Sequence, residues 1–174
     1  AASDVYKRQE QYKAQREETP EAIRLSVPII KDIIRAYRIP ILEVAGYEAD
    51  DVIGTLATEA GRQGIITYMM TPDKDYGQLV SDKVFMYRPK HTGGFEVMGV
   101  DEVKAKFDIQ SPAQVIDMLG LMGDSSDNIP GCPGVGEKTA QKLIAEFGSI
   151  ENLLEHTDQL KAVSYTHLTL PTKR

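Results

Sequence analysis

The stretch LMGDSSDNIPGCPGVGEKTAQKL, Leu121–Leu143, places an acidic loop directly before a glycine-rich turn, and the turn leads into a segment that carries lysines. Carboxylates in the loop attract cations, whereas glycines and the amides at a helix N-terminus accommodate anions. The fold around this stretch is therefore expected to bind a ligand that requires both a cation site and an anion site.

The glycine-rich turn, Gly131–Thr139, is compared with two phosphate-binding motifs. It nearly matches the phosphate loop of nucleotide-binding proteins, but Glu137 is inserted before Lys138 and no apolar strand precedes the turn. The helix-hairpin-helix motif matches better, with a Pro-Gly-Val-Gly turn between two helices and with Ala140 and Leu143 packing the second helix on the first. A plain turn between two helices is the structural alternative.

In a helix-hairpin-helix, glycines let the backbone approach a phosphate closely, and helix N-terminal amides donate to it without reading the base sequence. Lysines on the same side add positive charge. The residues assigned to DNA binding are Gly131, Gly134, Val135, Gly136, Lys138, Thr139 and Lys142.

A first helix is predicted near the N-terminus, with Thr19 as its N-cap and Pro20 as its first residue. Pro28 should kink or divide this helix, because proline lacks the N–H that a helix interior uses. The apolar stripe of the helix comprises Ile23, Val27, Ile30, Ile33, Ile34 and Tyr37.

Strand signals alternate with helical ones in the first half of the chain. Short apolar runs predict strands at Ile41–Val44 and Ile65–Met70, with a helix at Ala49–Gln63 between them. Val84–Tyr87 and Phe95–Met98 flank the turn signal HTGG and predict a hairpin or an edge pair. The inward-facing residues of the helix are expected to be Val52, Ile53, Leu56, Ala57 and Ala60.

After Asp101 the pattern is helical, with helices expected at 101–107, 112–122, 137–147 and 149–156. Units of strand, helix and strand that are followed by helices predict a parallel-sheet α/β domain with a helical C-terminal part.

The composition favours a cytoplasmic globular protein. The 174 residues are 41% apolar, which suffices for the core of one domain, and neither a membrane-spanning run nor a signal peptide is recognisable. The single cysteine, Cys132, cannot form an internal disulfide, in agreement with a reducing compartment. The net charge of -6 argues at first against a nucleic-acid ligand.

Both ends of the chain differ in pattern from the rest. Residues 1–8 and 163–174 resemble translated sequencing adapters on a gene fragment, and natural disordered termini are the alternative. The first interpretation leads us to expect an internal fragment of a longer protein.

Acidic residues form three clusters, each at the edge of a predicted element: Glu48, Asp50 and Asp51; Asp73 and Asp75; Asp124 and Asp127. Each cluster has a structural explanation when it is taken singly. The first could cap a helix through Asp50 or Glu48, the second could form a surface turn, and the third could form a turn or a helix cap.

Taken together, the clusters predict a metal site. Ligands of an open parallel sheet bind beyond the carboxyl ends of the strands, where the first two clusters lie. Seven carboxylates in one cleft would repel each other unless cations neutralised them, and oxygen ligands favour Mg²⁺ or Mn²⁺. Two such ions form the usual clamp for the attack of water on a phosphodiester. Without these seven charges the net charge is +1, which does not exclude DNA.

Four segments resemble the 5′ nuclease domain of bacterial DNA polymerase I, in the flap endonuclease superfamily: GYEADDVIGTLA, TPDKDYGQLVSD, LMGDSSDNIPGCPGVGEKTAQKL and FGSIENLLEH. The resemblance covers roughly residues 10–161. It implies an α/β fold with a mixed, largely parallel sheet flanked by helices. Residues 9–110 would form a partial, PIN-like 5′ nuclease core, and residues 111–162 a helical region with the helix-hairpin-helix module.

The resemblance also implies the chemistry. The three acidic clusters would hold two divalent ions, some directly and some through water, and a monovalent cation at the helix-hairpin-helix turn is a further expectation. Lys13 and Arg16 would contact the scissile phosphate and stabilise its developing charge, although the residues alone indicate only a solvated helix end. The implied substrate is DNA with 5′ flaps, nicks or 5′ ends, and the implied enzyme is a monomer.

The chain departs from the family at its N-terminus, because it lacks two strands that each bear an Asp in the family. We expect the parent protein to be a DNA polymerase I, and we expect the 174-residue chain alone to be inactive or nearly so, because two carboxylates of the metal site are missing. Two alternatives remain: a self-standing 5′-3′ exonuclease without a polymerase, and a non-catalytic DNA-binding module.

Overall fold

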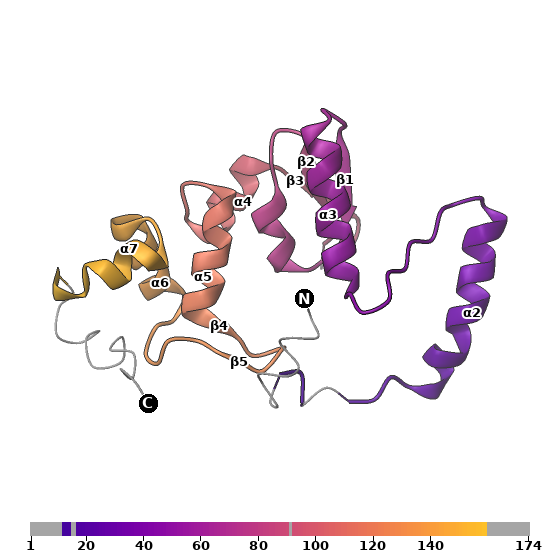
Figure 1. The fold of residues 1–174 in the computed structure, drawn as a ribbon, viewed down its shortest axis with the longest axis horizontal. Helices are drawn as coiled ribbons and strands as arrows, with labels where there is room; N and C mark the ends of the chain where they lie inside the picture. Colours follow the sequence, from indigo (N-terminus) through magenta and orange to yellow (C-terminus); the bar gives the residue numbers. More distant parts are fainter. Residues whose placement is uncertain (1–11, 15–16, 91, 160–174) are drawn as a thin grey trace. The chain divides into compact units, whose positions relative to one another are not determined.

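The computed structural model describes residues 12–14, 17–90 and 92–159, so Arg16 and the adapter-like ends lie outside the described residues. The chain divides into two compact units. The smaller unit comprises residues 1–53 and 126–128, and the larger unit comprises residues 54–125 and 129–174 (Figure 1).

The smaller unit contains helix α2 (Glu21–Ala36). Pro20 is the N-cap of this helix, so the prediction that Thr19 caps it is wrong by one position. The helix continues through Pro28 as one element, so the division that was predicted as one possibility does not occur, and the alternative of a kink stays a prediction. The missing N–H of Pro28 removes one backbone hydrogen bond, and the helix of 16 residues forms without it. No residue of α2 is buried, and its apolar stripe is exposed apart from Ile34, which is half-buried.

Residues 41–44, which were predicted to be a strand, adopt no regular structure. Leu42 and Val44 are exposed. A strand exists only when a neighbour takes up its backbone hydrogen bonds. None of the strands in the described part of the chain pairs with this segment.

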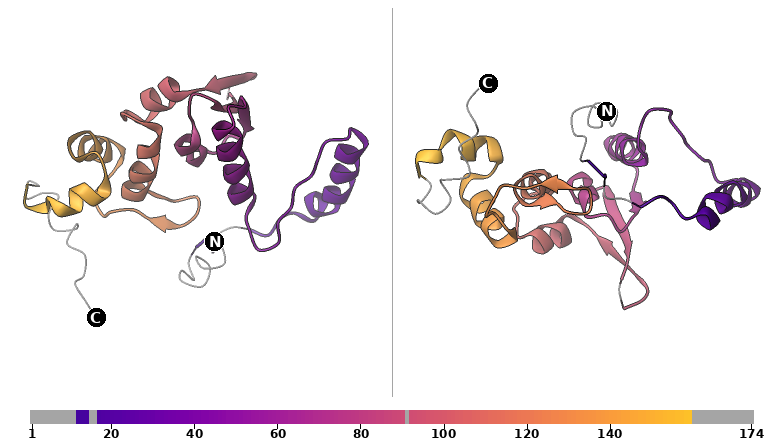
Figure 2. Two further views of the ribbon diagram at one scale, coloured as in Figure 1. Left: turned by 45° about the horizontal axis from the view of Figure 1, so that its top comes forward. Right: turned by 90° about the horizontal axis from the view of Figure 1, so that it is seen from below.

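A mixed sheet of three strands, in the order β1-β2-β3, forms part of the larger unit. Strand β1 (Thr67–Met70) runs parallel to β2 (Val84–Pro89), and β2 runs antiparallel to β3 (Phe95–Met98). The predicted hairpin and the mixed α/β architecture are thereby confirmed. The hairpin of β2 and β3 projects from the rest of this unit (Figure 2).

Strand β1 begins two residues later than predicted. The N–H of Ile65 still donates to the carbonyl of Ala60, and Gly64 has a φ of +77°, so the preceding helix and its end occupy the chain up to this point. Ile65 and Ile66 are exposed rather than buried in the sheet.

Helix α3 (Ala49–Arg62) approaches strand β2 near its C-terminal end. A Cβ atom on Gly61 would lie 2.8 Å from Cγ2 of Val84, so the helix and β2 are in close contact. Of the predicted inward-facing residues, only Ala57 is fully buried, and Ile53 and Leu56 are exposed.

The C-terminal helices occur where they were predicted, within one or two residues. They are α4 (Val100–Phe107), the 3₁₀ helix η2 (Pro112–Gln114) continuing into α5 (Val115–Met122), α6 (Glu137–Phe147) and α7 (Ile150–Glu155). The sequence did not predict two short 3₁₀ helices, η1 (Lys74–Leu79) and η3 (Thr157–Gln159).

The acidic loop lies on a short ladder, which the helical pattern did not predict. Strand β4 (Gly123–Asp124) pairs antiparallel with β5 (Ile129–Pro130). Residues 126–128 of the loop between these strands belong to the smaller unit.

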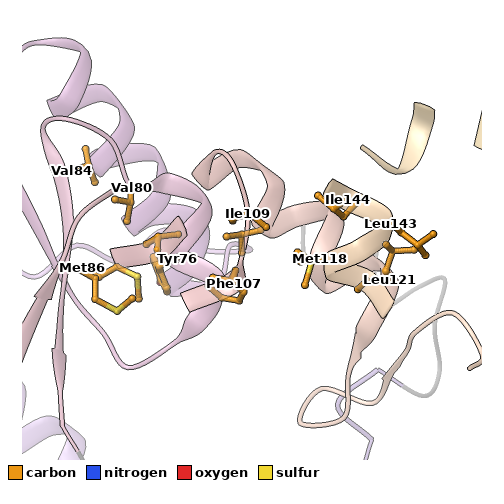
Figure 3. Packing of buried hydrophobic residues seen from close by; sticks show 14 of the residues in the cluster. Tyr76, Val80, Val84, Met86, Phe107, Ile109, Met118, Leu121, Leu143 and Ile144 are labelled. Atoms are coloured by element: carbon orange, nitrogen blue, oxygen red, sulfur yellow. The ribbon is translucent and has the colours of Figure 1, made fainter. Parts of the chain in front are cut away.

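Buried side chains form one hydrophobic cluster, which extends from the sheet to α6 within the larger unit (Figure 3). Met86 on β2, Met118 on α5 and Ile144 on α6 are almost completely buried. Two polar contacts link α5 to the end of α6 and the start of α7. The amide of Gln114 donates to the carbonyl of Gly148 at 2.8 Å, and Asp117 accepts from the N–H of Ile150 at 3.0 Å.

Candidate active site

Lys13 is the centre of a charged cluster in the smaller unit. Its ammonium lies 2.8 Å and 3.0 Å from the two carboxylate oxygens of Glu48 and 4.0 Å from a carboxylate oxygen of Asp127. Its backbone N–H also donates to the carbonyl of Asp127 at 3.0 Å. The structure thus brings together one predicted catalytic residue and one residue from each of two acidic clusters.

The environment of Lys13 keeps its side chain charged. Burial by itself would lower its pKa, but hydrogen bonds to Glu48 and Tyr12 and the charge of Glu48 outweigh burial and raise the pKa above its ordinary value of 10.5. The ammonium also lies over the ring of Tyr12, 4.7 Å from the ring centroid. Lys13 is therefore a permanent cation at neutral pH.

Replacing Lys13 by Met should lower the free energy of unfolding by about 1.5–3 kcal/mol, the usual contribution of a hydrogen bond to a charged group. A raised pKa in the folded state stabilises the protein fully below the unfolded value of 10.5, and this stabilisation is lost as the pH rises above that value. Urea unfolding should therefore give the same difference between wild type and variant at pH 7 and pH 9. The exposed Lys90, changed to Met, is the control and should leave stability unchanged. A difference that narrows at pH 9 would contradict the raised pKa.

The first acidic cluster is partly a helix cap. The carboxylate of Asp51 accepts from the backbone N–H of Glu48 at 3.2 Å, one half of a capping box at the start of α3. The capping explanation therefore applies to Asp51, which the sequence analysis did not name for this role. Glu48 directs its carboxylate to Lys13, and Asp50 is an exposed residue of the first helical turn.

The second cluster follows the carboxyl end of β1, where the sheet topology predicts a site. Asp73 is the N-cap of η1, and its carboxylate accepts from the N–H of Asp75 at 3.0 Å. The hydroxyl of Thr71 in turn accepts from the N–H of Asp73 at 3.1 Å. Oδ1 of Asp75 is buried. These bonds fix the backbone of the cluster.

Lys74 joins the second and third clusters inside the larger unit. Its ammonium lies 2.9 Å from Oδ2 of Asp124, and the two side chains are 38% and 17% exposed. The sequence pattern assigns Lys74 no role beyond separating Asp73 from Asp75. A lysine between two aspartates of a proposed metal site was the available signal, but its partner lies 50 residues away in the sequence.

The glycine-rich turn connects the ladder to α6. The N–H of Cys132 donates to the carbonyl of Leu121 at 2.8 Å, and the N–H of Val135 donates to the carbonyl of Cys132 at 3.0 Å. Val135 is buried, whereas Gly134 and Gly136 face open space. Within the described part of the chain, the amides of these two glycines donate to no acceptor. The turn therefore presents free donors beside Lys138 and Lys142, which are exposed.

No three acidic, His or Cys side chains gather closely enough to hold a metal ion among the residues that the structure describes. The donor chemistry nevertheless fits a hard cation, because Glu48 and Asp124 each hold a positively charged nitrogen at 2.8 to 2.9 Å. The single predicted site of seven carboxylates stays a prediction.

In the described ranges, no helix is both long and apolar enough to cross a membrane.

Two family models match the chain in order. The model described as "5'-3' exonuclease, N-terminal resolvase-like domain" matches residues 5–108, and the model described as "5'-3' exonuclease, C-terminal SAM fold" matches residues 110–170. The chain belongs to the 5′-3′ exonuclease family. The resemblance inferred from the four motifs is thereby confirmed.

Curated relatives agree with this assignment. DNA polymerase I of Bacillus subtilis is 46% identical over 151 residues, which are 86% of this chain and 17% of the relative. The 5'-3' exonuclease of Aquifex aeolicus is 40% identical over 150 residues, which are 86% of this chain and 50% of the relative. The chain thus spans about a sixth of the polymerase and half of the exonuclease.

Solved structures of similar fold include the T5 5'-exonuclease with bound zinc ions, with a TM-score of 0.72 and 23% identity over 95% of this chain and 60% of that chain. The catalytic core of Rad2 in complex with a DNA substrate has a TM-score of 0.54 and 17% identity over 90% of this chain and 45% of that chain. At these identities the two structures show the fold, which is that of 5′ nucleases with a helical C-terminal part.

Proposed function

We propose that this chain forms part of a 5′-3′ nuclease that hydrolyses DNA phosphodiester bonds at 5′ flaps, nicks and 5′ ends, and that the 174-residue chain alone is inactive or nearly so. The observation that carries the proposal is the match of both family models, in order, over almost the whole chain. We further propose a nuclease core in residues 9–110 and a DNA-binding region in residues 111–162, acting as a monomer in the cytoplasm.

Divalent metal ions, Mg²⁺ or Mn²⁺, are proposed as cofactors. The residues that would hold two ions are Glu48, Asp50, Asp51, Asp73, Asp75, Asp124 and Asp127. Bound ions would lower the pKa of a water molecule and stabilise the charge that develops on the oxygens of the phosphate. The support is the all-oxygen donor set and the cationic nitrogens that Glu48 and Asp124 already hold.

Lys13 is proposed to stabilise the scissile phosphate. Because its pKa is raised, the ammonium brings a full positive charge to the site at any physiological pH. Its flexible stem allows it to exchange a carboxylate partner for a phosphate oxygen. Arg16, which lies outside the described residues, is proposed for the same role from its place in the motif.

The glycine-rich turn is proposed to hold duplex DNA away from the cut. Free amides at Gly134 and Gly136, with no atom near the position of a Cβ, leave room for a phosphate to approach the backbone. The backbone and Lys138 contact phosphates rather than bases, so this binding should be sensitive to salt and independent of sequence. A monovalent cation at this turn remains part of the proposal.

The proposal is tested in a chimaera, because the chain spans half of the Aquifex aeolicus exonuclease. Residues 10–161 replace the matching segment of that exonuclease, and a labelled duplex with a 5′ flap is the substrate. We expect cleavage in Mg²⁺ that stops when EDTA removes the metal. A correctly folded chimaera that does not cleave, while the parent exonuclease does, would overturn the proposal.

The same experiment separates the alternatives. A non-catalytic DNA-binding module would retain its affinity for the flap duplex in EDTA and would show no cleavage in Mg²⁺. A self-standing exonuclease and a polymerase-linked one would behave alike in this assay, and they differ in the gene sequence that follows residue 161.

A further inference from the structure

Packing of the surrounding backbone fixes the positions of both Lys74 and Asp124, and so keeps the two residues in contact. Lys74 is the first residue of η1, in which Tyr76 and Gly77 are buried. A Cβ on Gly77 would lie 3.4 Å from Val115 and 3.5 Å from Phe107, so η1 packs closely against α4 and α5. The position of Lys74 is therefore set in part by α5, the helix that leads into the acidic loop.

Asp124 is equally constrained. It lies two residues after the end of α5, on β4, and pairs with Ile129 in the ladder. Gly123 beside it has a φ of +73°, and a Cβ there would overlap Gly131 and lie 2.6 Å from the carbonyl of Ile129. This close approach of two backbones leaves the loop little freedom to move Asp124 away from Lys74.

The two side chains differ in their access to solvent. Asp124 is 17% exposed, so its carboxylate needs a nearby positive charge, whereas Lys74 is 38% exposed on a stem of four methylene groups. The ammonium can therefore leave Asp124 for solvent, while Asp124 cannot follow. A cation of higher charge that reached Asp124 would take the place of Lys74.

We propose that Lys74 is an internal counter-cation of Asp124 that competes with the divalent metal ion. The proposal rests on the proposed function, in which Asp124 is a metal ligand. In the metal-free protein, Lys74 neutralises Asp124 and keeps the acidic loop in place. When the metal binds, Lys74 is displaced, and the metal affinity is lowered by the strength of the pair that has to be broken.

The test measures Mn²⁺ binding to the 174-residue chain at low salt, through the loss of the electron paramagnetic resonance signal of free Mn²⁺. Replacing Lys74 by Met keeps the length of the side chain and removes its charge. We expect the Kd to fall about fivefold, which corresponds to the loss of one partly exposed ion pair. Lys74→Arg, which keeps the charge, should remain within about twofold of wild type.

Lys83 provides the matched control. It precedes β2 and therefore lies at the opposite end of the parallel strands from Lys74, which follows β1. Lys83→Met removes the same charge from the chain and should leave the Kd within about twofold of wild type. Thermal unfolding in EDTA is the second measurement. Lys74→Met should melt about 2–4 °C below wild type, and this gap should shrink in Mn²⁺.

Weaker or unchanged Mn²⁺ binding by Lys74→Met would overturn the proposal, and so would an equal tightening by Lys83→Met. If neither wild type nor Lys74→Met bound Mn²⁺, the proposal would also be overturned. Removal of the Lys74 charge would then have failed to restore metal binding, so competition by Lys74 would not be the cause of the low affinity. The measurement involves neither DNA nor cleavage. Failure of the nuclease proposal is therefore recognised separately, as a lack of cleavage by the chimaera.

Discussion

Replacing Asp124 by Asn in the Aquifex chimaera is expected to reduce flap cleavage more than about a thousandfold. A carboxylate that holds a catalytic metal supports several kcal/mol of transition-state stabilisation, and Asn offers a neutral oxygen of much lower affinity. Asn keeps the shape of the side chain, so the ladder of β4 and β5 should persist. Single-turnover cleavage rates of the labelled flap duplex at saturating Mg²⁺ measure the effect.

Asp82→Asn is the control, because Asp82 is an exposed carboxylate next to Lys83 and outside the three acidic clusters. It should cleave at the rate of the unmodified chimaera. A second comparison separates chemistry from structure. If Asp124 acted only as a structural partner of Lys74, Asp124→Asn would have no further effect once Lys74 is changed to Met. We expect instead that the thousandfold loss persists in that background.

Elements that depend on local chemistry were predictable from the sequence. Helix α6 has the predicted bounds because Gly136 precedes it and Gly148, with a φ of +81°, ends it. The hairpin of β2 and β3 was predictable for the same reason, since the turn HTGG lies between two apolar runs. The acidic motifs were likewise recognisable because their residues are close neighbours in the chain.

Features that depend on distant partners were not predictable. The run Ile41–Val44 has the composition of a strand, but composition cannot supply a neighbouring strand, and the described structure shows none beside it. The pair of Lys74 and Asp124 joins residues that no motif spacing connects. Lys13 was assigned through the family resemblance, and its contacts with Glu48 and Asp127 appear only in the structure.

The second large effect is expected on stability. Replacing Gly131 by Ala should lower the free energy of unfolding by about 3 kcal/mol or more, which corresponds to a fall in Tm of about 6–12 °C. A Cβ on Gly131 would overlap the carbonyl group of Met122 and lie 2.6 Å from the amide nitrogen of Gly123. These are backbone atoms at the junction of α5 and β4, so no side-chain rotation can relieve the clash. Thermal and urea unfolding of the 174-residue chain measure the loss.

Gly136→Ala is the matched control from the same turn. Gly136 has a φ of -94°, which any residue adopts, and no atom lies within 4 Å of its Cβ position. This variant should unfold within about 0.5 kcal/mol of wild type. Equal stability of the two variants would mean that β4 and Gly131 are not in backbone contact. The acidic loop and the glycine-rich turn would then lack the shared anchor that holds Asp124 beside the proposed DNA-binding turn.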